Sequence, residues 1–194
     1  LQEKGINLLF CIGGDGTLKG AKAIADAANN RQANISIVGI PKTIDNDLGF
    51  VEKTFGFETS VQIASEIISC AHNEAEGAEN GIGIVKLMGR DSGFIAATAS
   101  LANSVVDFCL IPELPFHVHG PDGLCAAVHN SLKLHRHAVI VVAEGAGQDL
   151  FKNTKQRIDQ SGNILKDDIG EYLKSELSDY FKKDGTAISI KYLD

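Results

Sequence analysis

The chain has 194 residues, of which 44% are hydrophobic and 22% charged, and this balance predicts an ordinary globular protein with a sizeable core. The net charge of −7 argues against a role in nucleic-acid binding, because such proteins carry a basic surface. No apolar run approaches the roughly 18 residues that span a bilayer. The four cysteines lack metal-type spacing, which predicts reduced, mostly buried thiols. We therefore expect a cytoplasmic protein with neither membrane nor nucleic acid among its partners.

Apolar runs of strand length alternate with segments of helical periodicity along the chain. The first run, residues 6–12, precedes a helix expected over 17–30. The second run, residues 35–40, precedes a helix with an apolar stripe from Phe57 to Ala71. Four further strands are expected at 82–88, 105–111, 138–143 and 187–192. Three further helices are expected at 92–103, 122–134 and 167–183.

The strand-length runs are nearly continuous in Val, Ile and Leu, as in strands of a parallel sheet that is covered on both faces. Together with the alternation, this predicts an α/β fold, a three-layer sandwich with mostly parallel sheets. The polar stretch 151–166 predicts an exposed loop or domain junction with a turn at 159–163. The chain begins without Met and stops just after a strand-like run, so we expect a central piece of a longer polypeptide, incomplete at both ends.

Residues 13–17, Gly-Gly-Asp-Gly-Thr, follow the first strand and open the first helix; we call them the phosphate turn. Glycines let a backbone approach an anion, and the free N–H groups of a helix start face it. A carboxylate among phosphates is repulsive unless a cation lies between them, so Asp15 suggests Mg²⁺. Thr17 would cap the helix or touch a phosphate oxygen. The alternative is an ordinary turn in which Asp15 caps the helix.

Residues 41–47, Pro-Lys-Thr-Ile-Asp-Asn-Asp, follow the second strand, which we expect Pro41 to break; we call them the catalytic loop. Phosphoryl transfer needs positioning, charge neutralisation and a group that accepts the proton of the attacking hydroxyl. Asp45 would accept that proton, and Asp47 would support a metal ion or its water shell. Lys42 would offer positive charge to a phosphate. The alternative is a polar turn, since Asp and Asn are common in turns.

Four short motifs accompany these two segments: residues 54–59 (Thr-Phe-Gly-Phe-Glu-Thr), 88–90 (Met-Gly-Arg), 111–113 (Ile-Pro-Glu) and 143–145 (Ala-Glu-Gly). With them the sequence resembles the 6-phosphofructokinase family along nearly its whole length. The longer runs at 85–96 and 143–148 resemble its plant and kinetoplastid branch. The resemblance implies that residues 1–90 are the remainder of a nucleotide-binding domain, with the phosphate turn and the catalytic loop. It implies that residues 91–194 are part of a sugar-phosphate-binding domain.

The resemblance also implies a role for each matching residue. The phosphates of ATP would meet four residues of the phosphate turn: Gly14, Asp15, Gly16 and Thr17. Fructose 6-phosphate would contact six residues: Thr43, Asp45, Met88, Gly89, Arg90 and Glu144. Asp45, with Thr43 beside it, would take the proton from the 1-hydroxyl of the sugar, and Asp15 and Asp47 would hold Mg²⁺. Arg90 would neutralise charge in the transition state; its fixed fork of donors suits phosphate, although a surface ion pair is the alternative.

The phosphoryl donor is indicated by the residue after Asp15. Within the family a Gly there leaves room for the α-phosphate of ATP, whereas an Asp favours pyrophosphate. Gly16 therefore favours ATP, and Lys42, which is usual in pyrophosphate-dependent enzymes, favours the other donor. The combination resembles the plant and kinetoplastid forms, which are mostly ATP-dependent. We expect an ATP-dependent 6-phosphofructokinase that forms a homo-oligomer, a dimer or tetramer, when full length.

The sequence departs from the family in two respects. Much of the bacterial family has an Arg before the strand that leads to Met88, where this chain has Asn-Gly-Ile-Gly at 80–83. The first glycine-rich loop of the family is expected upstream of Leu1, and a segment that completes the sugar-phosphate site is expected beyond Asp194. The isolated chain would then hold an incomplete site and could be inactive. The competing functions are a pyrophosphate-dependent enzyme, a lipid or NAD kinase, and a non-catalytic regulatory subunit.

Overall fold

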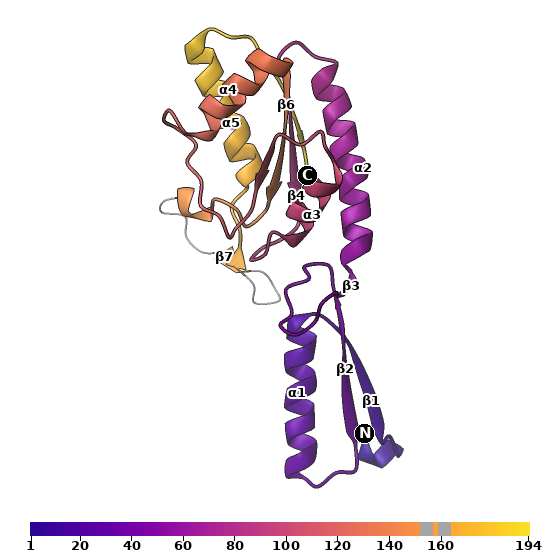
Figure 1. Cartoon of the computed structure of the whole chain (residues 1–194). Helices are drawn as coiled ribbons and strands as arrows, with labels where there is room; N and C mark the ends of the chain where they lie inside the picture. The colour runs from indigo at the N-terminus through magenta and orange to yellow at the C-terminus, as the bar shows by residue number, and fades with distance from the viewer. Residues whose placement is uncertain (152–156, 159–163) are drawn as a thin grey trace. The chain divides into compact units, whose positions relative to one another are not determined.

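The computed structural model describes residues 1–151, 157–158 and 164–194 (Figure 1). The chain divides into two compact units, Leu1–Thr59 and Ser60–Asp194. The domain boundary predicted at residue 90 differs from this division. The reason is that β4 (Gly81–Leu87) pairs with β6 (His137–Ala143) and β9 (Ser189–Leu193), which ties the residues before 90 to the second sheet. The roles predicted for the two domains stay predictions.

The first unit holds a parallel sheet of three strands in the order β1 (Leu8–Gly13), β2 (Ser36–Thr43) and β3 (Phe55–Gly56). A short 3₁₀ turn, η1 (Gln2–Lys4), precedes the sheet, and α1 (Asp15–Asn30) connects β1 to β2. The helix covers the face that includes Gly39, because a Cβ added to Gly39 would lie 2.8 Å from Leu18 Cδ2. A glycine in β2 thus lets α1 lie close to the sheet.

Pro41 does not end the second strand, so that prediction is wrong. Pro41 lies opposite Gly13 in the ladder with β1, and β2 continues to Thr43, where it pairs with Gly56 of β3. The fixed φ of proline is compatible with extended backbone, and only its missing N–H is lost to the ladder. Residues 41–43 of the predicted catalytic loop are therefore strand.

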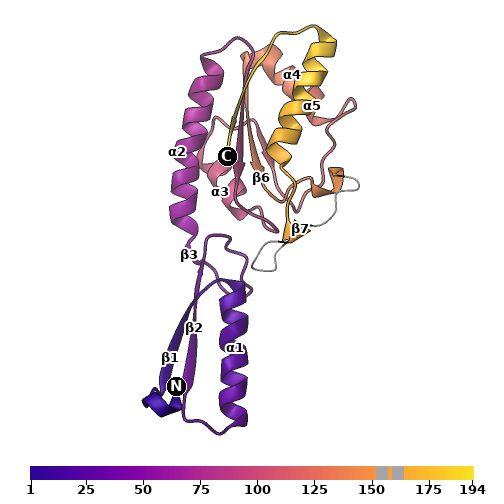
Figure 2. The same ribbon diagram turned by 180° about the vertical axis from the view of Figure 1, so that it is seen from behind.

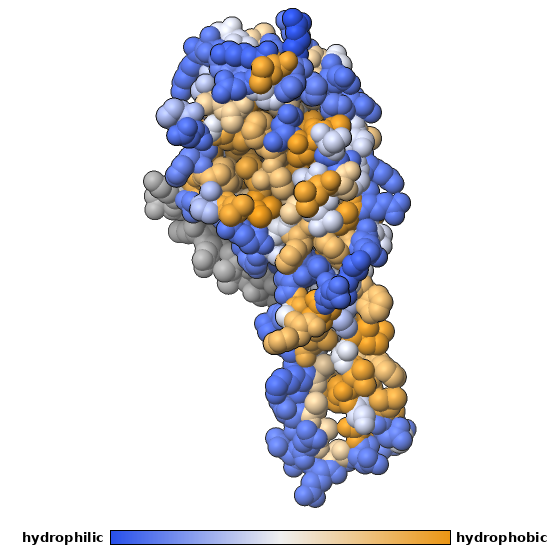
Figure 3. Space-filling view, in the orientation of Figure 1, coloured by the Kyte–Doolittle hydropathy of each residue, from blue (hydrophilic) through white to orange (hydrophobic). Residues whose placement is uncertain are grey.

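The second face of this sheet is apolar and exposed. Leu8, Phe10 and Ile12 alternate along β1, so they share one face, and their exposed fractions are 45%, 55% and 61%. Val38 lies opposite Phe10 on β2 and is also exposed. Figure 3 shows apolar side chains gathered over the strands of this unit. Among the described residues of the first unit, only one face of the sheet carries a helix.

The second unit has the predicted three layers around a parallel sheet in the order β5 (Phe108–Leu110), β6, β4 and β9. Most of α2 (Phe57–Glu76) and all of α3 (Phe94–Ala102) lie on one face, and α4 (Leu124–His135) and α5 (Ile169–Asp184) lie on the other (Figures 1 and 2). The prediction of parallel α/β architecture is confirmed. A Cβ on Gly81 or Gly83 would lie within 3.0 Å of carbonyl oxygens of α2. The two glycines that follow Asn80 therefore let α2 pack on β4.

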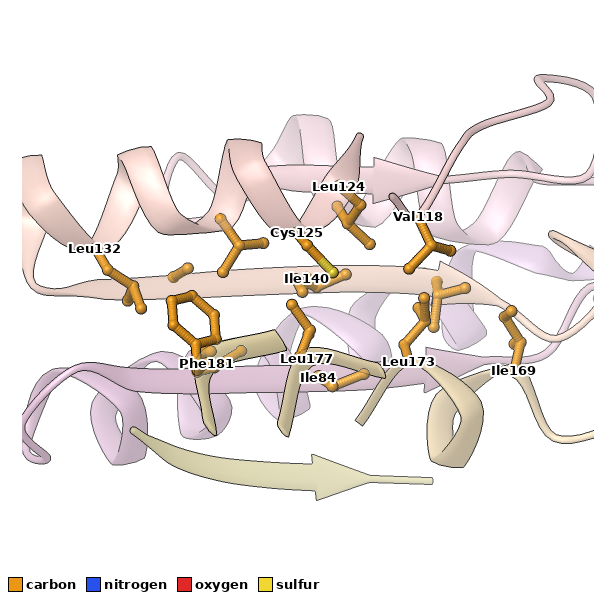
Figure 4. Close-up of a cluster of buried hydrophobic side chains, with 14 of the residues drawn as sticks. Ile84, Val118, Leu124, Cys125, Leu132, Ile140, Ile169, Leu173, Leu177 and Phe181 are labelled. Carbon is orange, nitrogen blue, oxygen red and sulfur yellow. The ribbon is translucent and has the colours of Figure 1, made fainter. Parts of the chain in front are cut away.

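The main core lies between this sheet and the pair α4 and α5. Figure 4 shows Ile84 and Ile140 of the strands facing Cys125 of α4 and Leu177 and Phe181 of α5. These five side chains are at most 1% exposed. Burying an aliphatic or aromatic side chain of this size contributes about 1.5–3 kcal/mol. The core thereby fixes the ends of β4 and β6, where several of the candidate residues lie.

The polar stretch that follows η2 (Gln148–Leu150) contains two short strands, β7 (Arg157–Ile158) and β8 (Ile164–Leu165), which pair antiparallel. The turn predicted at 159–163 lies outside the described residues. In the part of the chain that the structure describes, no helix is both long enough and apolar enough to cross a membrane. Cys125 is buried, but Cys70 and Cys109 are exposed, so the prediction of mostly buried thiols is wrong.

Candidate active site

The candidate residues lie where β1, β2, β4 and β6 reach their carboxyl ends, the edge at which open parallel sheets bind ligands. They form two groups. The phosphate turn and the catalytic loop belong to the first unit, and Met88, Gly89, Arg90 and Glu144 belong to the second.

The phosphate turn joins β1 directly to α1. The helix begins at Asp15, its N-cap is Gly14, and no side chain caps it. The interpretation of Asp15 or Thr17 as a cap is therefore wrong. The Thr17 side chain instead lies over Gly13, because a Cβ at position 13 would be 2.2 Å from Thr17 Oγ1. The first N–H groups of α1 have no partner within the helix, as at any helix start, and can donate to an anion.

Two features of the turn bear on donor and metal binding. The carboxylate of Asp15 contacts the ammonium of Lys19 at 2.6 Å, and both side chains are largely exposed. A cation at Asp15 would therefore compete with an exposed ion pair, and such pairs contribute little free energy. A Cβ added to Gly16 would have no neighbour within 4 Å. The space beside Gly16 is open within the first unit.

In the catalytic loop, Thr43 and Asp45 are joined by two hydrogen bonds. Thr43 Oγ1 donates to Asp45 Oδ2 at 3.1 Å, and the Asp45 N–H donates to Thr43 Oγ1 at 3.3 Å. Gly14 adjoins the same threonine, since a Cβ on Gly14 would lie 3.6 Å from Thr43 Cβ. The structure thus brings the phosphate turn beside the Thr43–Asp45 pair. This arrangement holds a carboxylate in a defined position, as a proton acceptor requires.

Asn46 and Thr54 hold the shape of the loop, a role that no pattern in the sequence indicates. Asn46 adopts a left-handed conformation (φ 54°), which asparagine tolerates better than most residues. Its Oδ1 accepts from the Thr54 N–H at 2.9 Å. The buried Thr54 hydroxyl donates to the Thr43 carbonyl at 2.7 Å. The motif at 54–59 was visible in the sequence, but this contact joins residues eleven positions apart.

In the second unit, the loops that follow β4 and β6 are joined to each other. The Gly89 N–H donates to Glu144 Oε1 at 3.3 Å, and the Gly145 N–H donates to the Gly89 carbonyl at 3.0 Å. The Glu144 N–H donates to the Leu87 carbonyl at 2.9 Å. The predicted residues Met88, Gly89, Arg90 and Glu144 therefore lie in one place. Met88 and Arg90 are exposed, and Glu144 is half-buried.

Glycines make this close approach possible. A Cβ on Gly145 would lie 1.8 Å from the Arg90 carbonyl oxygen, where no side chain fits. Gly89 has φ 138°, and a Cβ there would lie 2.4 Å from the Ser92 carbonyl oxygen. The backbones of the two loops thus touch each other. The sequence indicated Gly89 through its motif but not the contact that requires Gly145.

A charged network missed by sequence reasoning lies beside this group. Lys86 Nζ contacts Asp168 at 3.2 Å and Asp194 at 2.9 Å, and the Tyr192 hydroxyl donates to Asp168 at 2.8 Å. Burial disfavours the charged form of Lys86, but its hydrogen bonds to Asp194, Tyr192 and Asp168 outweigh burial and raise the pKa of the ammonium. Burial likewise opposes the Asp168 carboxylate, but the hydrogen bond from Tyr192 is among those that lower its pKa. The available signal was a lysine within an otherwise apolar strand.

A protein-family model described as Phosphofructokinase matches residues 1–192. The chain belongs to the phosphofructokinase family. Among curated relatives, ATP-dependent 6-phosphofructokinase 7 of Arabidopsis thaliana is 50% identical, and this chain covers 40% of it. The ATP-dependent 6-phosphofructokinase of Trypanosoma cruzi is 45% identical, and this chain covers 40% of its length. That of Borreliella burgdorferi is 49% identical, and this chain covers 45% of its length. Each match includes the whole of this chain, which spans less than half the length of these relatives.

The predicted likeness to plant and kinetoplastid phosphofructokinases agrees with these identities, but the Borreliella protein shows that some bacterial members are as similar. Solved structures share the fold. A pyrophosphate-dependent phosphofructokinase from Marinobacter aquaeolei matches with a TM-score of 0.71 at 22% identity, covering 98% of this chain and 45% of that one. Pichia pastoris phosphofructokinase matches with a TM-score of 0.66 at 24% identity, and the match covers 98% of this chain and 19% of the Pichia chain. At these identities the matches bear on the fold alone.

Proposed function

We propose that the full-length protein transfers the terminal phosphoryl group of ATP to the 1-hydroxyl of fructose 6-phosphate, giving fructose 1,6-bisphosphate in glycolysis. The observation that carries the proposal is the Thr43–Asp45 pair, held by two hydrogen bonds beside the phosphate turn. In a member of the phosphofructokinase family this is the expected place for a proton acceptor. The names of the similar relatives, which are called ATP-dependent, support ATP as the phosphoryl donor.

On the donor side, Gly14, Gly16 and Thr17 would present backbone N–H groups and a hydroxyl to the phosphates. Asp15 and Asp47 would hold Mg²⁺, which supplies charge neutralisation to the phosphates when bound. Their oxygen ligands fit this ion, because Mg²⁺ usually takes one or two carboxylates and completes its shell with water and phosphate oxygens. Within the described ranges no group of three or more His, Cys, Asp and Glu could hold a metal, and a substrate-bound Mg²⁺ does not need one.

On the acceptor side, Asp45 would take the proton of the sugar hydroxyl, with Thr43 fixing the orientation of its carboxylate. Met88, Gly89 and Glu144 would hold the sugar phosphate, and the exposed guanidinium of Arg90 would neutralise charge that develops on the transferred group. The contact between Gly89 and Glu144 supports their assignment to one binding site.

The choice of ATP over pyrophosphate rests on the open space beside Gly16. The experiment compares the full-length enzyme with a Gly16→Asp variant in a coupled assay, with ATP and pyrophosphate run in parallel. We expect the substitution to depress kcat/KM with ATP at least tenfold more than with pyrophosphate. Gly20→Asp is the matched control, because Gly20 lies on the same helix in equally open space. An unchanged ratio between the donors in the Gly16 variant would rule out the steric account.

The same assay separates the competing functions. A pyrophosphate-dependent enzyme, favoured by the exposed Lys42 at the end of β2, would use pyrophosphate before any substitution. A regulatory subunit would use neither donor, and a lipid or NAD kinase would use ATP without fructose 6-phosphate. We also propose a homo-oligomer in the cytoplasm. Sedimentation and cell fractionation test these two points, and the chloroplastic names of two Arabidopsis relatives make fractionation the more informative.

A further inference from the structure

The side chain of Gln148 joins the loop after β6 to the segment before α5. Its Nε2 donates to the Glu144 carbonyl at 3.0 Å and to the Asp167 carbonyl at 3.0 Å. Its Oε1 accepts from the Asp167 N–H at 3.0 Å. We call these three hydrogen bonds the Gln148 clamp. The carboxamide therefore binds both backbone groups of Asp167, nineteen positions away, and the backbone of Glu144 at the same time.

The clamp and Gly89 hold different parts of Glu144. The Glu144 carboxylate accepts from the Gly89 N–H, while the Glu144 carbonyl accepts from Gln148. Both bonds act on one residue at the carboxyl end of β6. The Glu144 N–H is held by the Leu87 carbonyl, so loss of the clamp would release the carbonyl side of the residue that carries the carboxylate. Gly147, just before Gln148, has φ 61°, and a Cβ there would lie within 3.0 Å of Phe116, Ile169 and Leu150, so no larger residue fits at this point of the loop.

The segment before α5, to which Gln148 binds, is itself held in place by hydrogen bonds and an ion pair. Asp168, next to Asp167, caps α5 by accepting from the N–H groups of Gly170 at 3.0 Å and Glu171 at 3.2 Å. The same carboxylate contacts Lys86 of β4 at 3.2 Å. The contacts therefore close a ring that runs from β4 to the start of α5, through Gln148 to Glu144, and back to Gly89 after β4. Within this ring, Gln148 is the side chain that ties the loop after β6 to the segment before α5.

The chemistry of the clamp is specific to glutamine. Two carbonyl oxygens require two donors and the Asp167 N–H requires an acceptor, and one carboxamide supplies all three. A glutamate has the acceptor but no donor for the carbonyls, and a methionine of similar length has neither. These two replacements keep the length of the side chain and remove different parts of the clamp.

We propose that Gln148 is a positioning residue for the sugar-phosphate site: it fixes the backbone of Glu144 and so the place where its carboxylate meets the substrate. The inference rests on the proposed function, because it takes Glu144 to bind fructose 6-phosphate. Gln148 itself does not contact the substrate in this account. Its loss should weaken sugar-phosphate binding and leave the donor side, which belongs to the other unit, unchanged.

The test compares Gln148→Met and Gln148→Glu in the full-length enzyme with Gln62→Met, which alters an exposed glutamine of α2. Steady-state kinetics give kcat and both KM values, and isothermal titration gives the dissociation constant for fructose 6-phosphate without turnover. We expect both Gln148 variants to raise KM and Kd for fructose 6-phosphate about tenfold, the loss of roughly one net hydrogen bond. We expect kcat within about threefold and KM for ATP unchanged, as for a loss of ground-state binding alone.

The outcomes separate this inference from the proposed function. If the unsubstituted enzyme neither binds nor phosphorylates fructose 6-phosphate, the proposed function fails and the inference fails with it. If that enzyme is active but the Gln148 variants keep its KM and Kd for the sugar phosphate, the inference alone is overturned. A purely structural role would lower the amount of folded enzyme and leave KM and Kd unchanged, and failure of both variants to fold would also reject positioning in favour of such a role. Circular dichroism and thermal melts of each variant identify that case.

Discussion

The parallel sheets of the two units consist of similarly apolar strands, but they are covered differently. In the second unit, helices lie on both faces, and the side chains of β4 and β6 that face α4 and α5 are almost fully buried. In the first unit, α1 covers one face, and Leu8, Phe10 and Ile12 are exposed on the other. The candidate loops of the two units also differ in the contacts that hold them. The catalytic loop is shaped largely by side-chain hydrogen bonds of Thr43, Asn46 and Thr54, whereas the loops around Gly89 and Glu144 fit backbone against backbone.

This difference shows where function and stability can be separated. A side chain in the half-exposed catalytic loop can change without opening a cavity, so its substitution should alter chemistry and leave folding nearly intact. A change at the interlocked loops of the second unit should affect both, because the same backbone contacts position the substrate and hold the fold together.

The largest effect is expected from Asp45→Asn in the full-length enzyme. The substitution keeps the size of the side chain but removes the proton acceptor, and one acid–base group contributes about 10²- to 10⁴-fold to turnover. We expect kcat to fall by that factor, with little change in the Kd for fructose 6-phosphate or in the melting temperature. Asp26→Asn, at an exposed acid of α1 paired with Lys22, is the control. Near-normal turnover of the Asp45 variant would remove this residue from the role of base.

The second prediction contrasts the two sheets directly in the 194-residue chain. Phe181→Ala removes a fully buried ring from the core, which costs about 3–5 kcal/mol in the free energy of unfolding. Phe10→Ala removes a ring that is 55% exposed and should cost less than about 1 kcal/mol. Urea unfolding followed by tyrosine fluorescence reports the second unit, since all three tyrosines (172, 180 and 192) lie there, and circular dichroism reports both. Equal costs would mean that the exposed face of the first sheet is covered in solution.

Local sequence signals predicted most of the architecture, because strand and helix periods and the glycine-rich turn are properties of neighbouring residues. They placed the phosphate turn, the Thr43 to Asp47 segment and the residues after β4 and β6 at the carboxyl ends of their strands, as the structure has them. The predictions failed where a feature depends on contacts between segments that are distant in the sequence. Pro41 stays in β2 because the ladder with β1 continues through it. The Gln148 clamp and the Gly145 contact join residues whose separation depends on how loops fold over the sheet, and no periodicity encodes that separation.

The smallest effect in this series comes from a pair of glycines in the two units. Gly145→Ala would place a Cβ 1.8 Å from the Arg90 carbonyl oxygen, so the two loops of the second unit must move apart, at about 1–3 kcal/mol for overpacking. Gly20→Ala places its Cβ in open space within α1 and should stabilise the first unit by about 0.5–1 kcal/mol, the difference in helix propensity. Urea unfolding of both variants measures whether the free energy of unfolding falls for Gly145→Ala and rises for Gly20→Ala. In the full-length enzyme only the Gly145 variant should also raise KM for fructose 6-phosphate, because its displaced backbone carries Glu144. A neutral Gly145 variant would show that these loops are as adaptable as the catalytic loop, and the contrast between the units would then rest on the core alone.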